Sequence, residues 1–244
     1  MKKVISILLL CLTMTSAVYA EKDANHVRQQ KARLVGITIG YIQSSMYESA
    51  PLISPTTISH NEYNRFHGFV GGLTLNPEFG AGIGILTGVQ YAYTPTFTRR
   101  GERHNYTRYI RSLQEVVIPL RLQYRYAFTP NFSVFAYTGP SFNIGTKWHQ
   151  YNEDIVNDEV TQKRDFDFYS QDVLNSENDN GYVLPKTLPY ARFHCMWGLG
   201  IGIIFNQHFR VEYCADWGIN DITPYAEKFT HLNRPVNILL SYMF

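Results

Sequence analysis

Between residues 114 and 126 the chain reads QEVVIPLRLQYRY. After the first residue, the even positions of this stretch are apolar or aromatic, whereas the odd positions include Glu115, Arg121 and Arg125. A period of two with this contrast indicates a β-strand that has one apolar face. Residues 209–218 repeat the pattern, so the alternation is not confined to one place.

The same alternation divides most of the chain into short segments. We predict eight strands, at about residues 34–44, 66–75, 79–93, 114–126, 132–146, 193–205, 209–218 and 235–244. The fifth strand alternates least cleanly, because Phe135 and Tyr137 would lie on its polar face. The connections between the strands run long, short, long, short, which is typical of an up-and-down antiparallel meander.

Glycine indicates which face meets lipid. Residues 79–93 and 193–205 each alternate large apolar side chains with glycines. A glycine face cannot fill the core of a soluble protein, but inside a narrow barrel it leaves room for long side chains such as Arg121 and Arg125. The apolar face therefore points outward, as in membrane barrels. The sequence predicts an all-β fold, an eight-stranded antiparallel transmembrane β-barrel with up-and-down topology.

Three short connections share one length. Each places three residues between two outward-facing residues, so the following strand keeps its apolar face outward. These connections are Asn76-Pro77-Glu78, Thr129-Pro130-Asn131 and Asn206-Gln207-His208. We expect them to be periplasmic turns, and we expect the four long connections to lie outside the cell. The long connections span about residues 45–65, 94–113, 147–190 and 220–234.

The N-terminus has the pattern of a secretory signal. Lys2 and Lys3 precede an apolar run, and Val18 and Ala20 occupy the −3 and −1 positions of a cleavage site. We predict a signal peptide at 1–20, a periplasmic tail at 21–33 and the barrel at 34–244. The barrel would lie in the outer membrane of a Gram-negative bacterium, with both termini in the periplasm. A net charge of +2 gives no indication of a nucleic-acid partner, and no motif predicts a metal or other cofactor.

Three stretches resemble a known group of proteins. They are EVVIPLRLQYRY from Glu115 to Tyr126, Thr138-Gly139-Pro140-Ser141-Phe142, and the ending Ser241-Tyr242-Met243-Phe244. With these stretches the chain resembles the porin-family or outer-membrane β-barrel domain proteins of Bacteroidota, which are small OmpA-type eight-stranded barrels. The resemblance implies a fold and a compartment and specifies no activity. Some members of the group are accessory barrels of the type IX secretion machinery, but no residue marks this chain as one of them.

The inward faces carry charged side chains that can pair across the lumen. We predict an ion-pair network of Glu115, Arg121, Arg125, Arg210, Glu212 and Asp216. Counted from the short turns, Arg125 lies level with Glu212, and Arg121 lies level with Asp216, so these are the expected pairs. Such residues can form a narrow, gated ion path or a buried plug that keeps the barrel rigid. We favour the plug, because the interior of an eight-stranded barrel is just wide enough for side chains to fill.

The connections at 94–113 and 147–190 carry opposite charge. The first has five arginines against one acid, and the second has nine acids against four basic residues. The five arginines (Arg99, Arg100, Arg103, Arg108 and Arg111) could bind lipid A phosphates or an acidic partner, because guanidinium groups match phosphate geometry. The alternative, which we favour, is that the two loops pair with each other or are simply solvated.

The outward face offers one candidate for catalysis. His67, Ser45 and Glu48 could meet at the mouth of the first two strands, but no local motif supports a triad. We therefore predict a non-enzymatic, monomeric barrel whose long loops bind a surface ligand, or which forms part of an envelope complex. Its partners would be outer-membrane lipid, lipopolysaccharide and, in a complex, an envelope protein. The alternatives are a small-solute pore and a lipid A modifying enzyme.

Overall fold

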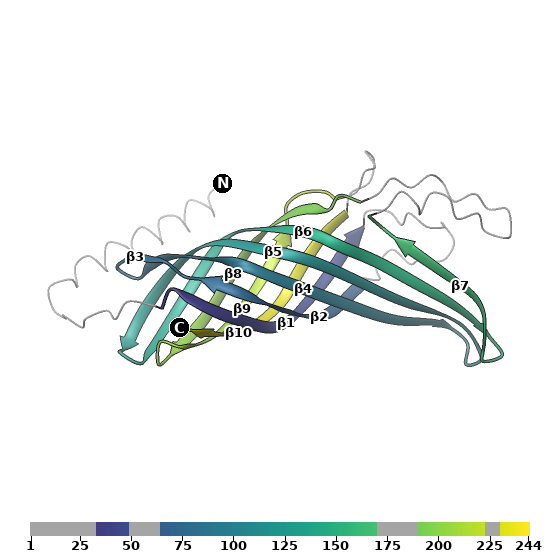
Figure 1. The fold of residues 1–244 in the computed structure, drawn as a ribbon, viewed down its shortest axis with the longest axis horizontal. Coiled ribbons are helices and arrows are strands. Elements are labelled where there is room, and N and C mark those ends of the chain that lie inside the picture. Colours follow the sequence, from purple (N-terminus) through teal and green to yellow (C-terminus); the bar gives the residue numbers. More distant parts are fainter. Residues whose placement is uncertain (1–32, 49–63, 170–189, 223–229) are drawn as a thin grey trace, which may run out of the picture. The chain divides into compact units, whose positions relative to one another are not determined.

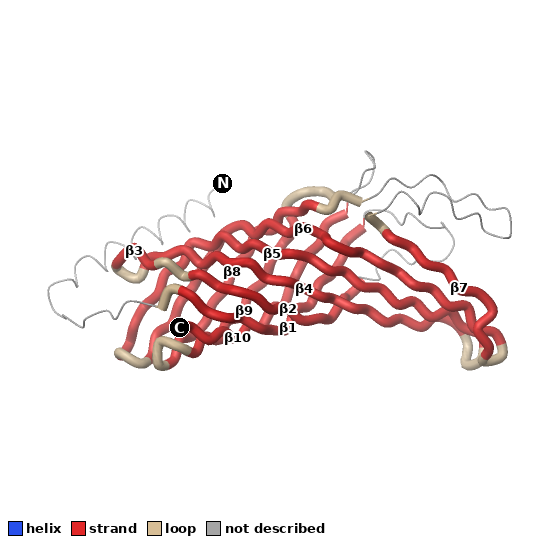
Figure 2. Tube along the Cα trace, in the orientation of Figure 1, coloured by secondary structure: helices blue, strands red, loops and turns tan. Residues whose placement is uncertain are grey.

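The computed structural model describes residues 33–48, 64–169, 190–222 and 230–244. Within these ranges all regular secondary structure is β-strand (Figures 1 and 2). The strands are β1 (Val35–Glu48), β2 (Asn64–Leu75), β3 (Glu78–Gly80), β4 (Ile83–Gly101), β5 (Asn105–Thr129), β6 (Phe132–Val156), β7 (Glu159–Asp167), β8 (Phe193–Phe205), β9 (Phe209–Gly218) and β10 (Thr230–Met243). Among the described residues, no helix has the length and apolar character needed to cross a membrane. The predicted signal peptide, and the predicted tail up to residue 32, lie outside the described ranges.

Eight of the strands form a closed antiparallel ring. The order of hydrogen-bonded neighbours is β2-β1-β10-β9-β8-β6-β5-β4, and β4 pairs with β2 to close the ring. The pairing of β1 with β10, in which Gly36 faces Met243, joins the first and last strands of the barrel. The ring confirms the predicted eight-stranded barrel. The two remaining strands are not members of the ring, since β3 pairs with β4 and β7 pairs with β6.

Side chains alternate between the two faces of the wall. On β5, Leu122 and Tyr124 are exposed, whereas Arg121, Gln123 and Arg125 are buried. This arrangement reverses that of a soluble barrel and confirms the predicted facing. A closed ring also pairs its backbone groups between strands, which is the condition for placing strands in lipid.

The segment predicted as one strand at 79–93 is two strands joined by a tight turn. Ala81 and Gly82 adopt positive φ angles of 50° and 77°, so the chain reverses between β3 and β4. As a result Leu75 pairs with Thr87 on β4, and the predicted pairing of Leu75 with Phe79 across a three-residue turn is wrong. The glycines of this segment belong to the turn and to close backbone contacts, because a Cβ on Gly82 would collide with the backbone of Arg125.

The other two short turns preserve the predicted facing. Phe205 pairs with Phe209 across a three-residue connection, as predicted. At the turn between β5 and β6, Thr129 pairs with Phe132, so the connection itself is two residues long. A register shift after Ala127 supplies the extra residue, which keeps the apolar face of β6 outward.

Two of the connections predicted as long loops are largely strand. β4 and β5 continue as a paired hairpin through residues 94–113, with a turn only at 102–104. β6 continues to Val156 and pairs there with β7, which occupies part of the predicted loop 147–190. Neither face of these extensions is uniformly apolar. The alternation of apolar and polar residues by which the barrel strands were predicted is therefore missing from them. Figure 1 shows β4, β5 and β6 running on past the other ring strands toward β7. We call these paired extensions of β4, β5 and β6, together with β7, the protruding sheet.

Candidate functional site: the barrel interior and the protruding sheet

The predicted interior residues lie inside the ring. All six are buried, and each shares a face of its strand with other buried residues. Arg121 and Asp216 form the predicted ion pair, with Nη2 lying 2.5 Å from Oδ1. Arg121 also donates from Nη1 to the carbonyl oxygen of Gly139. The pair reaches from β5 to β9, past β6 and β8, and therefore ties opposite parts of the wall together.

The second predicted pair is wrong. The ion-pair partner of Arg125 is Glu78, whose two carboxylate oxygens lie 2.6 and 2.8 Å from Nε and Nη2. Glu212 instead accepts a hydrogen bond at 3.1 Å from Arg210, two residues away on the same face of β9. The turn between β3 and β4 is the physical reason, because it places Glu78 inside the barrel rather than in an exposed loop.

The third interior cluster centres on Glu115 and was missed in part. Its carboxylate pairs with Arg234 through Oε2 and lies 3.0 Å from Nε2 of His194 through Oε1. Arg234 also donates to Asn143 at 3.1 Å. The strand alternation already placed His194 inward, but Arg234 belonged to a predicted loop. A register shift between Arg234 and Asn237 breaks the alternation of β10, which concealed its inward direction.

Two aromatic side chains fill the middle of the interior. Phe135 and Tyr137 point inward from β6, as predicted, and both are buried. Gly200 faces Tyr137 on the neighbouring strand, and a Cβ at that position would collide with the Tyr137 ring. The guanidinium of Arg210 lies over the Phe135 ring, with Cζ 3.8 Å from the ring centroid. The glycines of β8 thus leave room for these rings.

An apolar cluster covers the interior on the side of the protruding sheet. Trp148 is its largest member and is 2% exposed. The ring of Trp148 lies 4.9 Å from that of Phe168 and 4.8 Å from that of Tyr190. Burial raises the pKa of Tyr169, and the charge of Glu115 raises it further, so the phenol stays neutral. The cluster, which we call the aromatic cap, contains Phe66, Leu113, Trp148, Tyr169, Met196, Ile222 and Leu232, with Phe168 and Tyr190 packed against it.

The five predicted arginines do not converge on one patch. Arg99 and Arg108 face each other across β4 and β5, and Arg103 lies exposed in the turn between these strands. Arg111 occupies the opposite face of β5 and donates to Gln150. The side chain of Arg100 lies outside the described part of the structure.

The side chains of Arg99 and Arg108 have partners within the protein. Arg108 pairs with Glu153 at 3.0 Å, so the oppositely charged segments do meet at this position. Arg99 donates to the carbonyl oxygen of Arg103 at 2.6 Å, and its Cζ lies 3.6 Å from the centroid of the Tyr106 ring. Both contacts favour pairing within the sheet over a preformed phosphate clamp.

Among the described side chains, the hydrogen-bond partner of His67 is Tyr41 and not Ser45. His67 Nδ1 lies 2.5 Å from the hydroxyl of Tyr41, and the two rings stack. Ser45 pairs in register with Arg65, whereas His67 pairs with Gln43. The side chain of Glu48 lies outside the described part of the structure. Among the described residues, no group of three or more His, Cys, Asp or Glu side chains could hold a metal ion.

An apolar outer wall, a charged interior and a closed ring together define a membrane-spanning β-barrel. The family of outer membrane protein beta-barrel domains matches residues 23–223. The chain therefore belongs to this family, and its compartment is the outer membrane. No curated protein matches the chain.

Solved structures of small outer membrane barrels are similar to this chain. Ail of Yersinia pestis, in complex with the heparin analogue sucrose octasulfate, shares 12% identity at a TM-score of 0.38, over 86% of this chain and 99% of Ail. Neisserial surface protein A shares 5% identity at a TM-score of 0.34, over 85% of this chain and 97% of that protein. OprG of Pseudomonas aeruginosa shares 11% identity at a TM-score of 0.34, over 88% of this chain and 98% of OprG.

Proposed function

We propose that this protein is a non-enzymatic barrel of the cell surface that binds a partner through its protruding sheet. The observation that carries the proposal is the pairing of β4, β5, β6 and β7 beyond the ring, where Thr94 to Gly101 of β4 pair without interruption with Tyr106 to Leu113 of β5. Ring closure does not require these residues, because the pairing of β4 with β2 ends at Tyr93. A rigid sheet held outside the barrel is suited to contact with another molecule.

The edge of the protruding sheet is the part best suited to a partner. Among the described residues, β7 pairs with β6 alone, so its other edge is open to hydrogen bonding. An extended polypeptide can add to such an edge as a further strand. Val160 on β7 and the neighbouring Val156 are both exposed, and they offer apolar contacts beside the backbone groups.

The interior argues against the pore alternative. Arg121 and Asp216 cross the lumen, Phe135 and Tyr137 occupy its middle, and the aromatic cap lies over one end. An interior filled in this way is typical of eight-stranded barrels that do not conduct. The hydrogen bond between His67 and Tyr41 likewise gives no support to a lipid A modifying enzyme.

The orientation and the lineage belong to the proposal. We place the short-turn end, which carries the turns near residues 76, 130 and 207 and both chain termini of the barrel, in the periplasm, and the protruding sheet outside the cell. Lipopolysaccharide then surrounds the outer part of the wall. Membership in the Bacteroidota porin group and the signal peptide at 1–20 remain predictions.

The test is site-specific photocrosslinking on intact cells. A photoreactive amino acid at Val160 should give a discrete protein adduct, whereas the same group at Leu199, on the apolar outer face of β8, should give none. With the photoreactive amino acid at the exposed Val156 instead, the adduct should be lost when residues 159–167, which form β7, are replaced by a short turn. Absence of any adduct at 160, together with stable current steps in planar bilayers, would overturn the proposal in favour of a pore.

A further inference from the structure

The apolar outer face of the barrel ends at one pair of residues on β6 and β8. Ile144 on β6 pairs with Phe193 on β8, and the two residues are 43% and 52% exposed. The ring of Phe193 also stacks with that of Phe142, so the apolar surface is continuous up to this pair. The hydrocarbon part of the membrane can therefore extend to Ile144 and Phe193 on these two strands.

A lysine follows this pair on the outward face of β6. Lys147 is exposed and lies opposite Gln114 of β5. Gln114 faces outward, because its Oε1 atom accepts a hydrogen bond at 2.7 Å from the hydroxyl of the exposed Tyr91. A register shift leaves Thr146 without a partner in the ladder, and so Lys147 is the first outward residue beyond Ile144 with such a partner. It carries a positive charge at the border of the apolar wall.

An arginine lies beside this lysine, immediately before β8. Arg192 is exposed and precedes Phe193. Its Nη1 atom donates at 3.3 Å to the carbonyl oxygen of Thr146, so the guanidinium lies beside the peptide group that leads to Lys147. The guanidinium also lies over the ring of Tyr169, with Cζ 4.9 Å from the ring centroid. These contacts hold the side chain in place and leave most of its five N–H donors for another acceptor.

The two positive charges are not neutralised within the described part of the protein. Neither Lys147 nor Arg192 forms an ion pair with a residue in the described ranges. The acid on the outward face of β6, Glu153, is paired with Arg108 at 3.0 Å. Both cations therefore remain available to an anion outside the protein.

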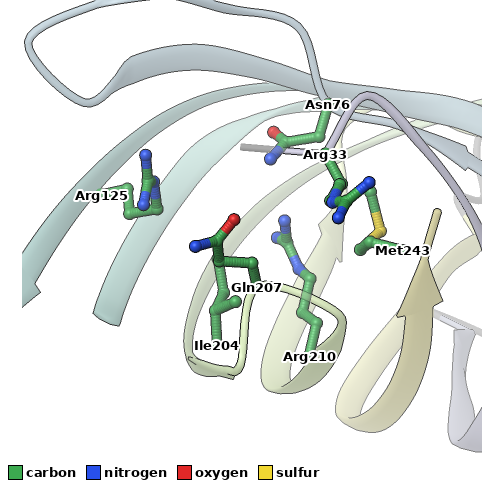
Figure 3. Close-up of a pocket in the computed structure, with 7 residues that line it drawn as sticks. All are labelled: Arg33, Asn76, Arg125, Ile204, Gln207, Arg210 and Met243. Atoms are coloured by element: carbon green, nitrogen blue, oxygen red, sulfur yellow. The ribbon is translucent and has the colours of Figure 1, made fainter. Parts of the chain in front are cut away.

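The opposite rim of the barrel is arranged differently. Figure 3 shows Arg33, Arg125 and Arg210 around a small cavity at the short-turn end. Arg125 is buried with Glu78 as its partner, and Arg210 is buried with Glu212 as its partner. Charges that are buried and paired in this way cannot reach a lipid headgroup. Arg33 is exposed and provides a control for charge at this end.

We propose that Lys147 and Arg192 bind a phosphate group of lipopolysaccharide. The inference rests on the orientation proposed above, which places this end of the barrel outside the cell. Acyl chains would lie against Ile144 and Phe193, and a phosphate of the lipid A headgroup would lie beside the two cations. An ammonium group supplies a compact charge, and a guanidinium directs paired donors at phosphate oxygens.

The experiment follows the thermal midpoint of the purified full-length barrel in micelles of an uncharged detergent. Lipid A with both phosphates is added in steps, and dephosphorylated lipid A and inorganic phosphate are added in parallel. Phosphorylated lipid A should raise the midpoint and saturate, because a ligand that binds only the folded state stabilises it. Dephosphorylated lipid A should bind at least tenfold more weakly, and inorganic phosphate should give no shift at the same concentrations. An equal shift with either of these two probes would overturn the proposal.

Three variants and a charge-matched control assign the effect to the two cations. Lys147→Gln and Arg192→Gln change exposed residues, so both should fold, and each should weaken binding of phosphorylated lipid A about tenfold through loss of a charge-assisted hydrogen bond. Arg192→Lys keeps the charge and should lose less. Arg33→Gln removes one positive charge at the opposite rim and should bind like the parent.

Unchanged binding in both glutamine variants of Lys147 and Arg192 would overturn the proposal. Weaker binding in Arg33→Gln alone would also overturn it, and would move the lipid A site to the short-turn end. Micelles surround the barrel whichever way it is oriented in the cell, and the assay contains no protein partner. Its failure is therefore distinguishable from failure of the photocrosslinking test at Val160.

Discussion

The segments 79–93 and 193–205 have the same sequence pattern but different structures. Both alternate large apolar residues with glycines. The second is a single strand, β8, in which Gly198 and Gly200 make room for side chains from other strands. The first is divided at Ala81 and Gly82 into two strands with a turn between them. A glycine face can therefore mean either crowded side chains opposite it or a backbone that turns, and only the partner strand decides which.

The largest expected effect follows from placing a side chain at Gly198. A Cβ there would collide with both Arg121 and Asp216, so Gly198→Val should separate the buried ion pair. Breaking such a pair costs about 3–5 kcal/mol and overpacking adds about 1–3 kcal/mol. The free energy of unfolding, measured in urea with the barrel in lipid vesicles, should fall by at least the overpacking cost of about 1–3 kcal/mol.

The matched control for Gly198 is Gly71 on the outer face of β2. A Cβ at Gly71 would lie 3.6 Å from the carbonyl oxygen of Thr38, which is an ordinary contact. Gly71→Val should therefore change the free energy of unfolding by less than about 1 kcal/mol. Equal losses in the two variants would show that Gly198 does not serve the ion pair.

A smaller effect is expected at Gly200, where the obstacle is a single ring. Gly200→Ala would push against Tyr137 alone among the nearest atoms, and overpacking of this kind costs about 1–3 kcal/mol. Tyr137→Leu should remove the obstacle. A double-mutant cycle on the free energy of unfolding should then give a favourable coupling of about 0.5–3 kcal/mol. Additive losses would contradict direct contact between the two positions.

The wall of the barrel could be predicted because its cause is local. Each ring strand between lipid and lumen needs one apolar face, and that requirement appears in the sequence as a period of two. The predicted strand 193–205 has the same bounds as β8, and 209–218 has the same bounds as β9. Beyond the membrane the requirement ends, which is why the extensions of β4 and β5 were expected to be a loop.

The interior could be predicted only where the alternation continued without interruption. Arg121 and Asp216 lie on regular strands, and their pairing followed from counting residues along them. Glu78 and Arg234 were missed because a turn and a register shift changed their directions. Both changes depend on pairing with a neighbouring strand, which the residues of one strand do not encode.

The turn in the first segment should tolerate no side chain at its second position. Gly82 has a φ of 77°, and a Cβ would also collide with the carbonyl oxygen of Arg125. Strained backbone of this type costs about 1–3 kcal/mol, so Gly82→Ala should lower the free energy of unfolding by that amount. Gly71→Ala serves as the control, since a Cβ there makes only ordinary contacts. An unchanged value for Gly82→Ala would argue that residues 79–93 form one strand after all.

The smallest effect is expected at Ala81, and its sign separates the two structures. Ala81 has a φ of 50°, where an L-residue is strained by roughly 1–2 kcal/mol and glycine is not. Glycine also loses about 0.4–1 kcal/mol more backbone entropy on folding, so Ala81→Gly should give a net gain of about 0.5 kcal/mol. In a continuous strand the same substitution would cost roughly 0.5–1 kcal/mol, since glycine is unfavourable there. Urea unfolding of Ala81→Gly beside the parent therefore distinguishes a turn from a strand by the direction of the shift alone.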